Sequence, residues 1–361
     1  MNLNEWVLVI PSIREINLEY LKFIPEGLKI FIIDDTDGSI KANRKQMEVF
    51  NYAHQKKIMK SNYDLIPHKT AACRNFALYY IWKYTDYKFI LSLDDDCMTR
   101  GGFMEQYSVL GKSLELETVV KPSWFNTIDL FKLDQKIYAR GYPYFERCDQ
   151  KQKMVKTKAK VALHMGLWDK ILDTDAMDKY LFKDYQLERP GASLKKQIIR
   201  IGDSKNIVKF PFSAMNFGFI RELSPIMYQF PMWEKFTDRY SLWRFDDIWA
   251  GYVIQSLVAL KNDAVTIGAP VIQHMKLGNL EKEMLGEHYG HLISPYFYSV
   301  IDEAVSHVSK GPYAEMYVEL FDHVVSNAKK LQLKYRIPHL YWKYIFDTAC
   351  KLSRWGKLFT K

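Results

Sequence analysis

The chain has 361 residues, a length that predicts either two domains or one large α/β domain with an appendage. Hydrophobic residues make up 48% and charged residues 26%, a composition that excludes wholesale disorder. No apolar stretch approaches the roughly 18 residues that a membrane-spanning helix needs. Lys and Arg outnumber Asp and Glu by 51 to 42, and the net charge of +9 favours an anionic partner such as a nucleotide phosphate, a nucleic acid or an acidic membrane surface.

The N-terminal residues lack the positive charge and apolar core of a signal peptide, so we expect a cytoplasmic protein. The four cysteines lie far apart and do not show the paired spacing of a zinc site or a disulfide framework. We therefore expect reduced thiols at Cys73, Cys97, Cys148 and Cys350.

Three short apolar runs predict buried strands at Trp6–Ile10, Leu28–Ile33 and Lys88–Leu93. A helix is expected over Thr70–Tyr84, because apolar and aromatic residues recur there at mostly helical spacing. Buried strands separated by helices indicate a parallel α/β sheet, and ligands bind at the carboxyl ends of such strands. Polar or special residues follow all three runs at that edge: Pro11 and Ser12, Asp34 and Asp35, and Asp94–Asp96.

The triplet Asp94–Asp96 carries the strongest chemical signal. Three adjacent carboxylates repel one another, so burying them without a cation is unfavourable. Strand alternation puts Asp94 and Asp96 on one side and Asp95 on the other, which offers a D-x-D pair to a Mg²⁺ or Mn²⁺ ion that bridges a diphosphate. His274 follows the strand-like run at 270–273 and is a candidate third ligand. No G-x-G-x-x-G follows a strand, which disfavours a dinucleotide-binding site.

Later segments leave alternatives open. The lysine-rich segment Gln150–Lys160 has no clean apolar period, and we interpret it as a solvated loop, either without a role or acting as a mobile lid. His288 and His291 have the spacing of a surface pair or of two metal ligands. A helix is expected over Asp246–Leu260, with two acids at its start as an N-cap or as functional groups. Beyond about residue 293 the chain is expected to be helical, punctuated by Pro295, Pro312 and Pro338.

The last segment, Leu340–Lys361, has two interpretations. Its apolar residues from Tyr341 to Trp355 could line one face of a helix, while its lysines and arginine face elsewhere. This pattern fits a helix docked on its own domain, and equally a helix that lies on an anionic membrane surface. Peripheral membrane contact through this basic segment is therefore a candidate interaction.

A series of short blocks extends over roughly residues 5–290, in this order: Val9–Arg14, Ile33–Asp37, Ala71–Asn75, Asp94–Cys97, Arg140–Pro143 with Arg147, His164–Trp168, Met215–Phe219 with Arg221–Leu223, Arg244–Gly251 and His274–Lys276. The blocks resemble those of the reversibly glycosylated polypeptide family, which includes the plant UDP-arabinopyranose mutases. The early blocks also resemble nucleotide-sugar glycosyltransferases of the GT-A fold. Strong basicity, Tyr144–Glu146 within the arginine block and the lysine-rich stretch after it depart from the plant pattern.

The resemblance implies a GT-A-type, Rossmann-like central sheet flanked by helices over residues 1–290, and a helical extension over 291–361 that can pack on it. It also implies a nucleotide-sugar site. Asp35 would accept from the uracil N–H, Arg74 would contact the base or the diphosphate, and Asp94 would reach the ribose. The other implied contacts to the nucleotide sugar are Pro11, Ser12, Ile13, Arg14, Asp95 and Asn216. The implied ligands of a Mn²⁺ or Mg²⁺ cofactor are Asp94, Asp96 and His274.

The resemblance also implies catalytic residues. Arg140 and Arg147 match the two arginines that the family associates with mutase activity and reversible self-glycosylation. A guanidinium stays protonated at neutral pH and is an awkward nucleophile, so we expect either arginine to stabilise the departing UDP instead. Asp246 or Asp247 would handle the acceptor of the sugar.

The expected function is metal-dependent interconversion of the pyranose and furanose forms of a UDP-sugar. The alternative is a glycosyltransferase that passes the sugar to a polysaccharide or lipid-linked acceptor, which the basic tail and lysine-rich segment favour. A scaffold that binds a nucleotide sugar without turnover would not need the Asp triplet, His274 and both arginines. A nucleic-acid partner is not expected, since it would leave the carboxylates unexplained. A homo-oligomer is compatible with these features.

Overall fold

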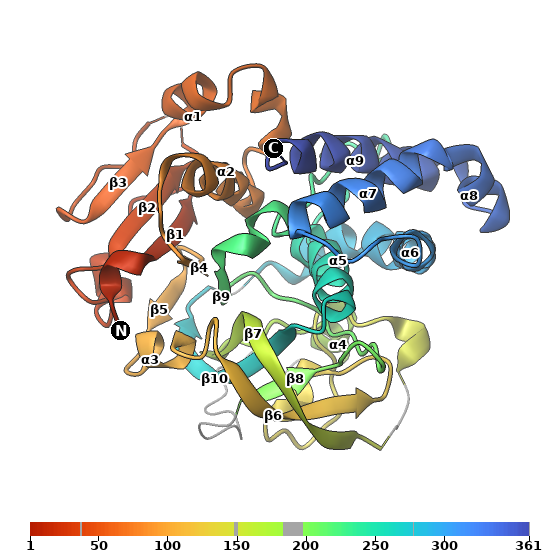
Figure 1. Cartoon of the computed structure of the whole chain (residues 1–361), viewed down its shortest axis with the longest axis horizontal. Coiled ribbons are helices and arrows are strands. Elements are labelled where there is room, and N and C mark those ends of the chain that lie inside the picture. Colours follow the sequence, from red (N-terminus) through yellow and green to blue (C-terminus); the bar gives the residue numbers. More distant parts are fainter. Residues whose placement is uncertain (37, 148–150, 183–197, 277, 361) are drawn as a thin grey trace.

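The computed structural model describes residues 1–36, 38–147, 151–182, 198–276 and 278–360. Its first half contains the predicted parallel strands. β1 (Trp6–Ser12) pairs in parallel with β2 (Lys29–Asp34) and with β4 (Phe89–Leu93), and β3 (Met47–Phe50) extends β2 at the edge. These strands are buried because helices α1 (Tyr52–Met59) and α2 (Asn75–Tyr84) lie in this half of the molecule (Figure 1). The three predicted strands are confirmed.

The second half of the sheet contains both antiparallel and parallel pairs. β9 (Asn216–Ile220) runs antiparallel to both β4 and β7 (Lys153–Lys170), and the ten-stranded sheet continues in the order β7-β6-β8-β10-β5. The ranges are Ser113–Lys121 for β6, Ile199–Ile201 for β8, Ala264–His274 for β10 and Cys97–Thr99 for β5. The prediction of an α/β protein is confirmed, but the described sheet is mixed, so parallel pairing holds only for part of it.

The lysine-rich segment is mostly a strand. Lys153–Lys160 forms the first part of β7 and pairs antiparallel with β6, from Lys121 opposite Lys153 to Ser113 opposite Lys160. Val155, Thr157 and Ala159 alternate with the lysines and are less exposed than Lys156 and Lys158. The interpretation as a loop or lid was therefore wrong for these residues, because they alternate with a period of two and pair with β6. Residue 150 lies outside the described part of the chain.

Two predicted helices match closely. The segment expected at Thr70–Tyr84 forms a 3-10 turn at Ala71–Arg74 followed by α2, and the turn begins where Thr70 accepts a hydrogen bond from the Ala72 N–H. α5 spans Asp246–Leu260 and is buried along most of its length. Two shorter helices, α3 (Phe103–Tyr107) and α4 (Ala176–Leu181), connect strands.

The C-terminal region is helical, as expected. It contains α6 (Leu280–Val305), α7 (Tyr313–Ser326), α8 (Ala328–Lys334) and α9 (His339–Lys357), which lie together on one side of the molecule (Figure 1). Pro312 and Pro338 stand directly before α7 and α9, but Pro295 lies inside α6. The prediction that Pro295 separates two helices was therefore wrong. Packing of its buried neighbours Ile293 and Phe297 stabilises the helix on both sides of it. The division after residue 290 falls within α6.

The last helix is docked on the protein. α9 packs on α7, and its Trp342, Ile345, Leu352 and Trp355 are buried. The Trp355 indole donates to the Pro225 carbonyl at 2.9 Å, and Phe359 packs against Trp82 of α2. The apolar face that could have met a membrane is therefore covered by protein. No helix in the described residues is long and apolar enough to cross a membrane.

Replacing Trp355 by Ala is expected to lower the free energy of unfolding by about 3–5 kcal/mol, because a fully buried indole leaves a cavity and an unpaired carbonyl. Urea denaturation measures this change. Leu333→Ala is the control, since Leu333 is 68% exposed and should change the free energy by less than about 0.5 kcal/mol. Similar values for the two variants would show that α9 is not part of the core.

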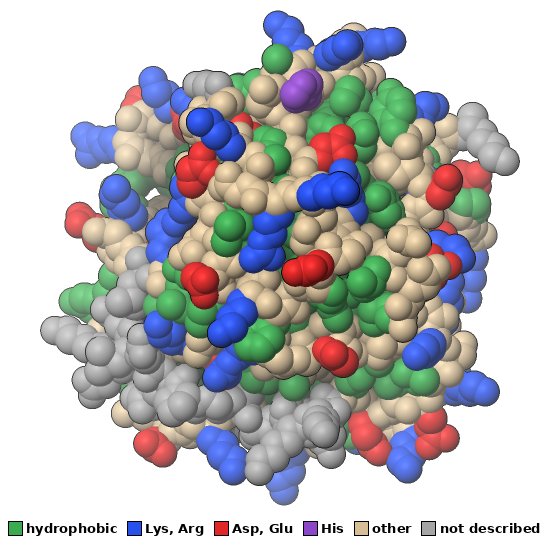
Figure 2. Space-filling view, turned by 90° about the vertical axis from the view of Figure 1, so that its left-hand side faces the viewer, with side chains coloured by type: hydrophobic (Ala, Val, Ile, Leu, Met, Phe, Trp, Pro, Cys, Tyr) green, Lys and Arg blue, Asp and Glu red, His purple; other side chains and the backbone are tan. Residues whose placement is uncertain are grey.

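The remaining features are the distribution of surface charge and the state of the cysteines. Figure 2 shows Lys and Arg side chains interspersed with Asp and Glu over one face, rather than gathered into a continuous basic track. Cys73, Cys97 and Cys350 are free thiols, as expected, and residue 148 lies outside the described part of the chain.

Candidate nucleotide-sugar site

Three adjoining cavities open at the carboxyl ends of β1 and β4, and all three are lined by Asp94. The β1 cavity, of about 240 Å³, lies between the end of β1 and the Asp triplet. The main cavity, of about 560 Å³, extends from the start of α2 to the starts of α5 and α6. The deep cavity, of about 230 Å³, reaches the end of β10. The site therefore lies at the predicted edge of the sheet.

The β1 cavity brings together the residues expected to cradle the nucleotide. Pro11, Ser12, Ile13 and Arg14 line it with Asp95. The Ser12 hydroxyl donates to Asp95 Oδ2 at 2.7 Å, and the Arg14 guanidinium lies 3.1 Å from the same oxygen. Asp95 thus holds the end of β1 in place and leaves backbone groups of this turn along the cavity wall.

Arg74 and Asp94 form the wall between the cavities. Arg74 is buried and donates to Ala71 O at 2.9 Å, to Ser92 Oγ at 2.7 Å and to Ala214 O at 2.8 Å, and it forms an ion pair with Asp94. Burial raises the pKa of Asp94 to about 7 even though the Arg74 cation opposes the rise. Because all its nitrogens are engaged, Arg74 orients Asp94 and has little freedom to follow a ligand.

Asp96 and His274 approach each other in the deep cavity, with His274 Nε2 at 4.0 Å from Asp96 Oδ1. The Nδ1–H of His274 donates to the Ile171 carbonyl at 3.1 Å, which leaves Nε2 as the nitrogen facing Asp96. A carboxylate and an imidazole are suitable ligands for Mn²⁺. Asp94 lines the same cavity but is paired with Arg74, so Asp96 and His274 are the better placed of the three expected ligands.

Arg140 is clamped between two carboxylates at the junction of the main and deep cavities. It donates to Asp173 at 2.9 Å and to Asp247 at 2.8 Å, and Asp247 in turn accepts from the Ala214 N–H at 3.1 Å. Burial alone would raise the pKa of Asp173, but Arg140 outweighs it and holds that pKa well below its usual range. The three side chains form one rigid unit beneath the cavity.

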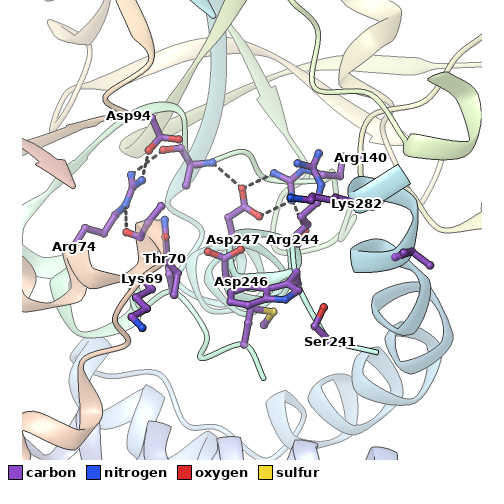
Figure 3. Close-up of a pocket in the computed structure, with 16 residues that line it drawn as sticks. Lys69, Thr70, Arg74, Asp94, Arg140, Ser241, Arg244, Asp246, Asp247 and Lys282 are labelled. Carbon is purple, nitrogen blue, oxygen red and sulfur yellow. Dashed lines mark hydrogen bonds and ion pairs between the residues drawn. The ribbon is translucent and has the colours of Figure 1, made fainter. Parts of the chain in front are cut away.

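Asp246 differs from its neighbour. Figure 3 shows Asp246 in the main cavity between the Arg74–Asp94 and Arg140–Asp247 pairs, with no dashed line to any other residue drawn. Burial, and next the adjacent Asp247 carboxylate, raise the pKa of Asp246 to about 6. Phe245 occupies the N-cap position of α5, so neither aspartate is the N-cap. Asp247 has a structural role, and Asp246 remains available to a ligand.

Arg147 does not join Arg140 in the cavities. Its guanidinium lies between the rings of Tyr138 and Tyr144, at 4.5 and 4.2 Å, and pairs with Asp178 at 2.8 Å and Asp175 at 3.2 Å. It lines none of the three cavities that meet at Asp94. The expected contact of Arg147 with departing UDP is therefore not supported by its position, although Arg140 is well placed.

The two histidines of α6 do not form a pair. His288 is exposed, whereas His291 is mostly buried, with Nε2 at 3.0 Å from Asp175 Oδ2. Asp175, Glu287 and His291 come close enough to share a metal ion, but Arg147 already pairs with Asp175 and Arg244 donates to Glu287 at 2.8 Å. The charges are balanced by arginines, which favours a buried ion-pair network at this position.

Two expected contacts lie away from the cavities. The Asp35 side chain is 0% exposed and accepts from Tyr52 Oη at 2.8 Å, from His68 Nδ1 at 3.1 Å and from the Thr70 N–H at 3.1 Å. Asn216 is fully buried in β9, where it accepts from the Tyr107 hydroxyl. Neither side chain lines one of the three cavities, so the uracil contact of Asp35 and the ligand contact of Asn216 stay predictions. Asp35 anchors the loop that leads into α2.

Other residues of the site were not identified from the sequence, because most of them come from loops without local patterns and one lies in α6. Asp173 clamps Arg140, and Lys69, Gln229, Ser241, Trp243 and Lys282 line the main cavity. Lys69 and Arg244 have positive φ angles of 58° and 65°. This backbone conformation is unusual for residues other than glycine and often marks functional sites. Their positive φ angles, which glycine adopts more readily than other residues, are not visible in a sequence.

Comparison with known proteins identifies the family of the chain. The family model described as reversibly glycosylated polypeptide matches residues 1–333. The probable UDP-arabinopyranose mutase 4 of Arabidopsis thaliana is 28% identical over 302 residues, covering 80% of this chain and 76% of the relative. The UDP-arabinopyranose mutase 1 of Oryza sativa subsp. japonica is 27% identical over 307 residues, covering 81% and 77%. The chain therefore belongs to the reversibly glycosylated polypeptide family.

Proposed function

We propose that this protein is a UDP-sugar mutase that interconverts pyranose and furanose forms, with UDP-arabinopyranose as the first candidate substrate. The relatives are named for this activity. The observation that carries the proposal is the clamped Arg140 in one cavity with Asp94 and with Asp246, which has no ion pair among the described residues, next to a cavity formed by the end of β1. Such an arrangement has room for a nucleotide on one side and for a sugar on the other.

In this proposal the backbone around Ser12 and Ile13 holds the nucleotide, and the diphosphate lies near Asp96 and His274. A Mn²⁺ or Mg²⁺ ion bound there would neutralise negative charge on the diphosphate. When the anomeric C–O bond to UDP breaks, its electron pair stays with the diphosphate oxygen. Arg140 and Arg74 are fixed in advance by their carboxylate partners, so they stabilise this charge without reorganising.

Exchange of ring size needs a proton transfer. One sugar hydroxyl must lose its proton as its oxygen bonds to the anomeric carbon. The bond from that carbon to the former ring oxygen must break as this oxygen gains a proton, and the diphosphate oxygen then bonds to the anomeric carbon again. Asp246 is the cavity carboxylate with the freedom to make both proton transfers, and its pKa of about 6 suits proton exchange near neutral pH. Arg147 acts outside this step, through the ion pairs around Asp175.

The alternative function is transfer of the sugar to an acceptor. It is favoured by the extent of the main cavity, which continues past the carboxylates to Trp243 and to Leu285 on α6. An acceptor glycan could enter there. The two functions differ in whether turnover requires an added acceptor.

Asp96→Ala is expected to abolish metal-dependent turnover. Purified protein is incubated with Mn²⁺ and UDP-arabinopyranose without acceptor, and the nucleotide sugars are resolved by chromatography. The mutase proposal predicts a furanose-form peak from the wild type and its loss in Asp96→Ala, with Mn²⁺ affinity reduced at least tenfold by calorimetry. Metal-dependent UDP binding without isomerisation would instead favour the transferase. The intact mass of the protein after incubation tests self-glycosylation.

A further inference from the structure

Gln229 is a buried residue in the wall of the main cavity. It is 2% exposed, and its side-chain oxygen Oε1 is buried without a hydrogen-bond partner among the described residues. Leaving a buried amide oxygen unpaired is unfavourable. Oε1 has almost no accessible surface in this arrangement, so a ligand in the cavity removes this cost when the amide turns toward it.

The backbone of Gln229 is held with unusual firmness. The Asn75 side chain donates to the Gln229 carbonyl at 2.8 Å and accepts from the Gln229 N–H at 2.9 Å. Asn75 is fully buried and follows Arg74 at the start of α2, so the same turn that orients Asp94 also fixes Gln229. Both contacts use the backbone of Gln229, and the fold therefore does not need glutamine at this position.

The residue that follows Gln229 bonds to the backbone of Asp246. The N–H of Phe230, the next residue, donates to the Asp246 carbonyl at 3.1 Å. Ser241 and Trp243 line the same cavity. The backbone N–H of Trp243 donates to the Gly286 carbonyl at 3.2 Å and holds this residue in place. An amide, a carboxylate and a hydroxyl beside an indole make a lining suited to a hydroxyl-rich ring, which offers several donors and one apolar face.

We propose that Gln229 is a substrate-contact residue that recognises hydroxyl groups of the glycosyl unit, and that Asn75 is the residue that positions it. This inference rests on the proposed function and adds to it the part of the site that distinguishes a UDP-sugar from UDP alone. The nucleotide binds in the β1 cavity, which Gln229 does not line. Loss of the Gln229 amide should therefore affect the sugar and not the nucleotide.

Gln229→Met tests the proposal, because it keeps the side-chain length and the two bonds to Asn75 while removing the amide. Calorimetry with UDP and with UDP-arabinopyranose, in the presence of Mn²⁺, measures both affinities. We expect the affinity for UDP to stay within twofold of the wild type and that for UDP-arabinopyranose to fall about tenfold, which equals about 1.4 kcal/mol. The melting temperature should be unchanged or higher, since an unsatisfied polar group is lost.

Gln46→Met is the matched control. Gln46 Nε2 is also buried without a partner in the described structure, but this residue lines a groove at the amino ends of β2 and β3, opposite the catalytic edge. It should leave both affinities unchanged. Gln229→Glu is a second variant, which keeps an acceptor oxygen for sugar hydroxyls and should therefore retain more affinity for UDP-arabinopyranose than Gln229→Met does.

The outcomes separate the two proposals. If the wild type does not bind UDP-arabinopyranose, the proposed function is overturned and this inference with it. If the wild type binds it and Gln229→Met binds it equally well, only the inference is overturned. The same conclusion follows if neither Gln229 variant folds, because the residue would then be structural.

Discussion

Arg140→Met is expected to lower the free energy of unfolding by about 3–5 kcal/mol, the largest stability loss that we foresee for a single charged residue here. The variant leaves Asp173 and Asp247 buried without their cation. Denaturation by urea at pH 7 measures the change. Arg354→Met is the control, since its pair with Asp64 is about half exposed on both sides and should contribute less than about 1 kcal/mol.

The loss in Arg140→Met should depend on pH in a defined direction. In the wild type the pKa of Asp173 is held below its usual range, so this carboxylate contributes stability above the pKa of the unfolded chain, about 3.9. That contribution disappears as the pH falls through the lower pKa of the folded state. Without Arg140 the buried carboxyls bind protons more readily, so the difference between variant and wild type should shrink below about pH 4. A constant difference down to pH 3 would contradict the clamp.

Asp246→Asn is expected to reduce turnover by roughly 10²–10⁴-fold, the range typical of a lost acid–base group, while UDP affinity stays within twofold. In the wild type, turnover should decline as the pH falls below about 6, because protonation removes the carboxylate that accepts the hydroxyl proton. The residual activity of the variant should lose this dependence. The measurement is kcat against pH between 5 and 8, with the exposed Asp238→Asn as the control.

Stability provides an independent check on Asp246. Its folded-state pKa is raised above the unfolded value, so its charge costs stability above about pH 6, and this cost is absent below the unfolded pKa near 3.9. Asp246→Asn should therefore be at least as stable as the wild type at pH 7. An inactive variant that is also destabilised would show that Asp246 supports the fold instead of the chemistry.

Local pattern was sufficient for the elements that position the site. β1, β2 and β4 are continuous apolar runs, and such runs are specific to buried strands when polar residues end them. Asp95 bonds Ser12 while Asp94 and Asp96 line the deep cavity, but the triplet lies in the turn between β4 and β5 and all three aspartates line the β1 cavity, so strand alternation is not the cause of this arrangement. α5 was also predictable, because its apolar run is long and begins with two acids.

Contacts between distant segments could not be predicted from local sequence patterns. Arg140 and Arg147 stand seven positions apart in one motif, yet one is clamped by Asp173 and Asp247 in the cavity and the other lies between two tyrosines outside it. Asp35 follows its strand as a ligand residue would, but Tyr52, His68 and Thr70 enclose its side chain. The side chains that fold over these groups come from other parts of the chain.

The sequence by itself predicted the strand-end carboxylates and, through the resemblance of its short blocks, the family, because both depend on short-range order along the chain. Only the tertiary structure decided which of those groups remain open to a ligand. It enclosed Asp35 and Asn216. It paired Asp94 with Arg74 and Arg140 with Asp247, and it left Asp246 and Gln229 in the cavity wall. The physical reason is that burial and pairing of a charge depend on neighbours tens to hundreds of residues away, and such neighbours leave no periodicity for a sequence to show.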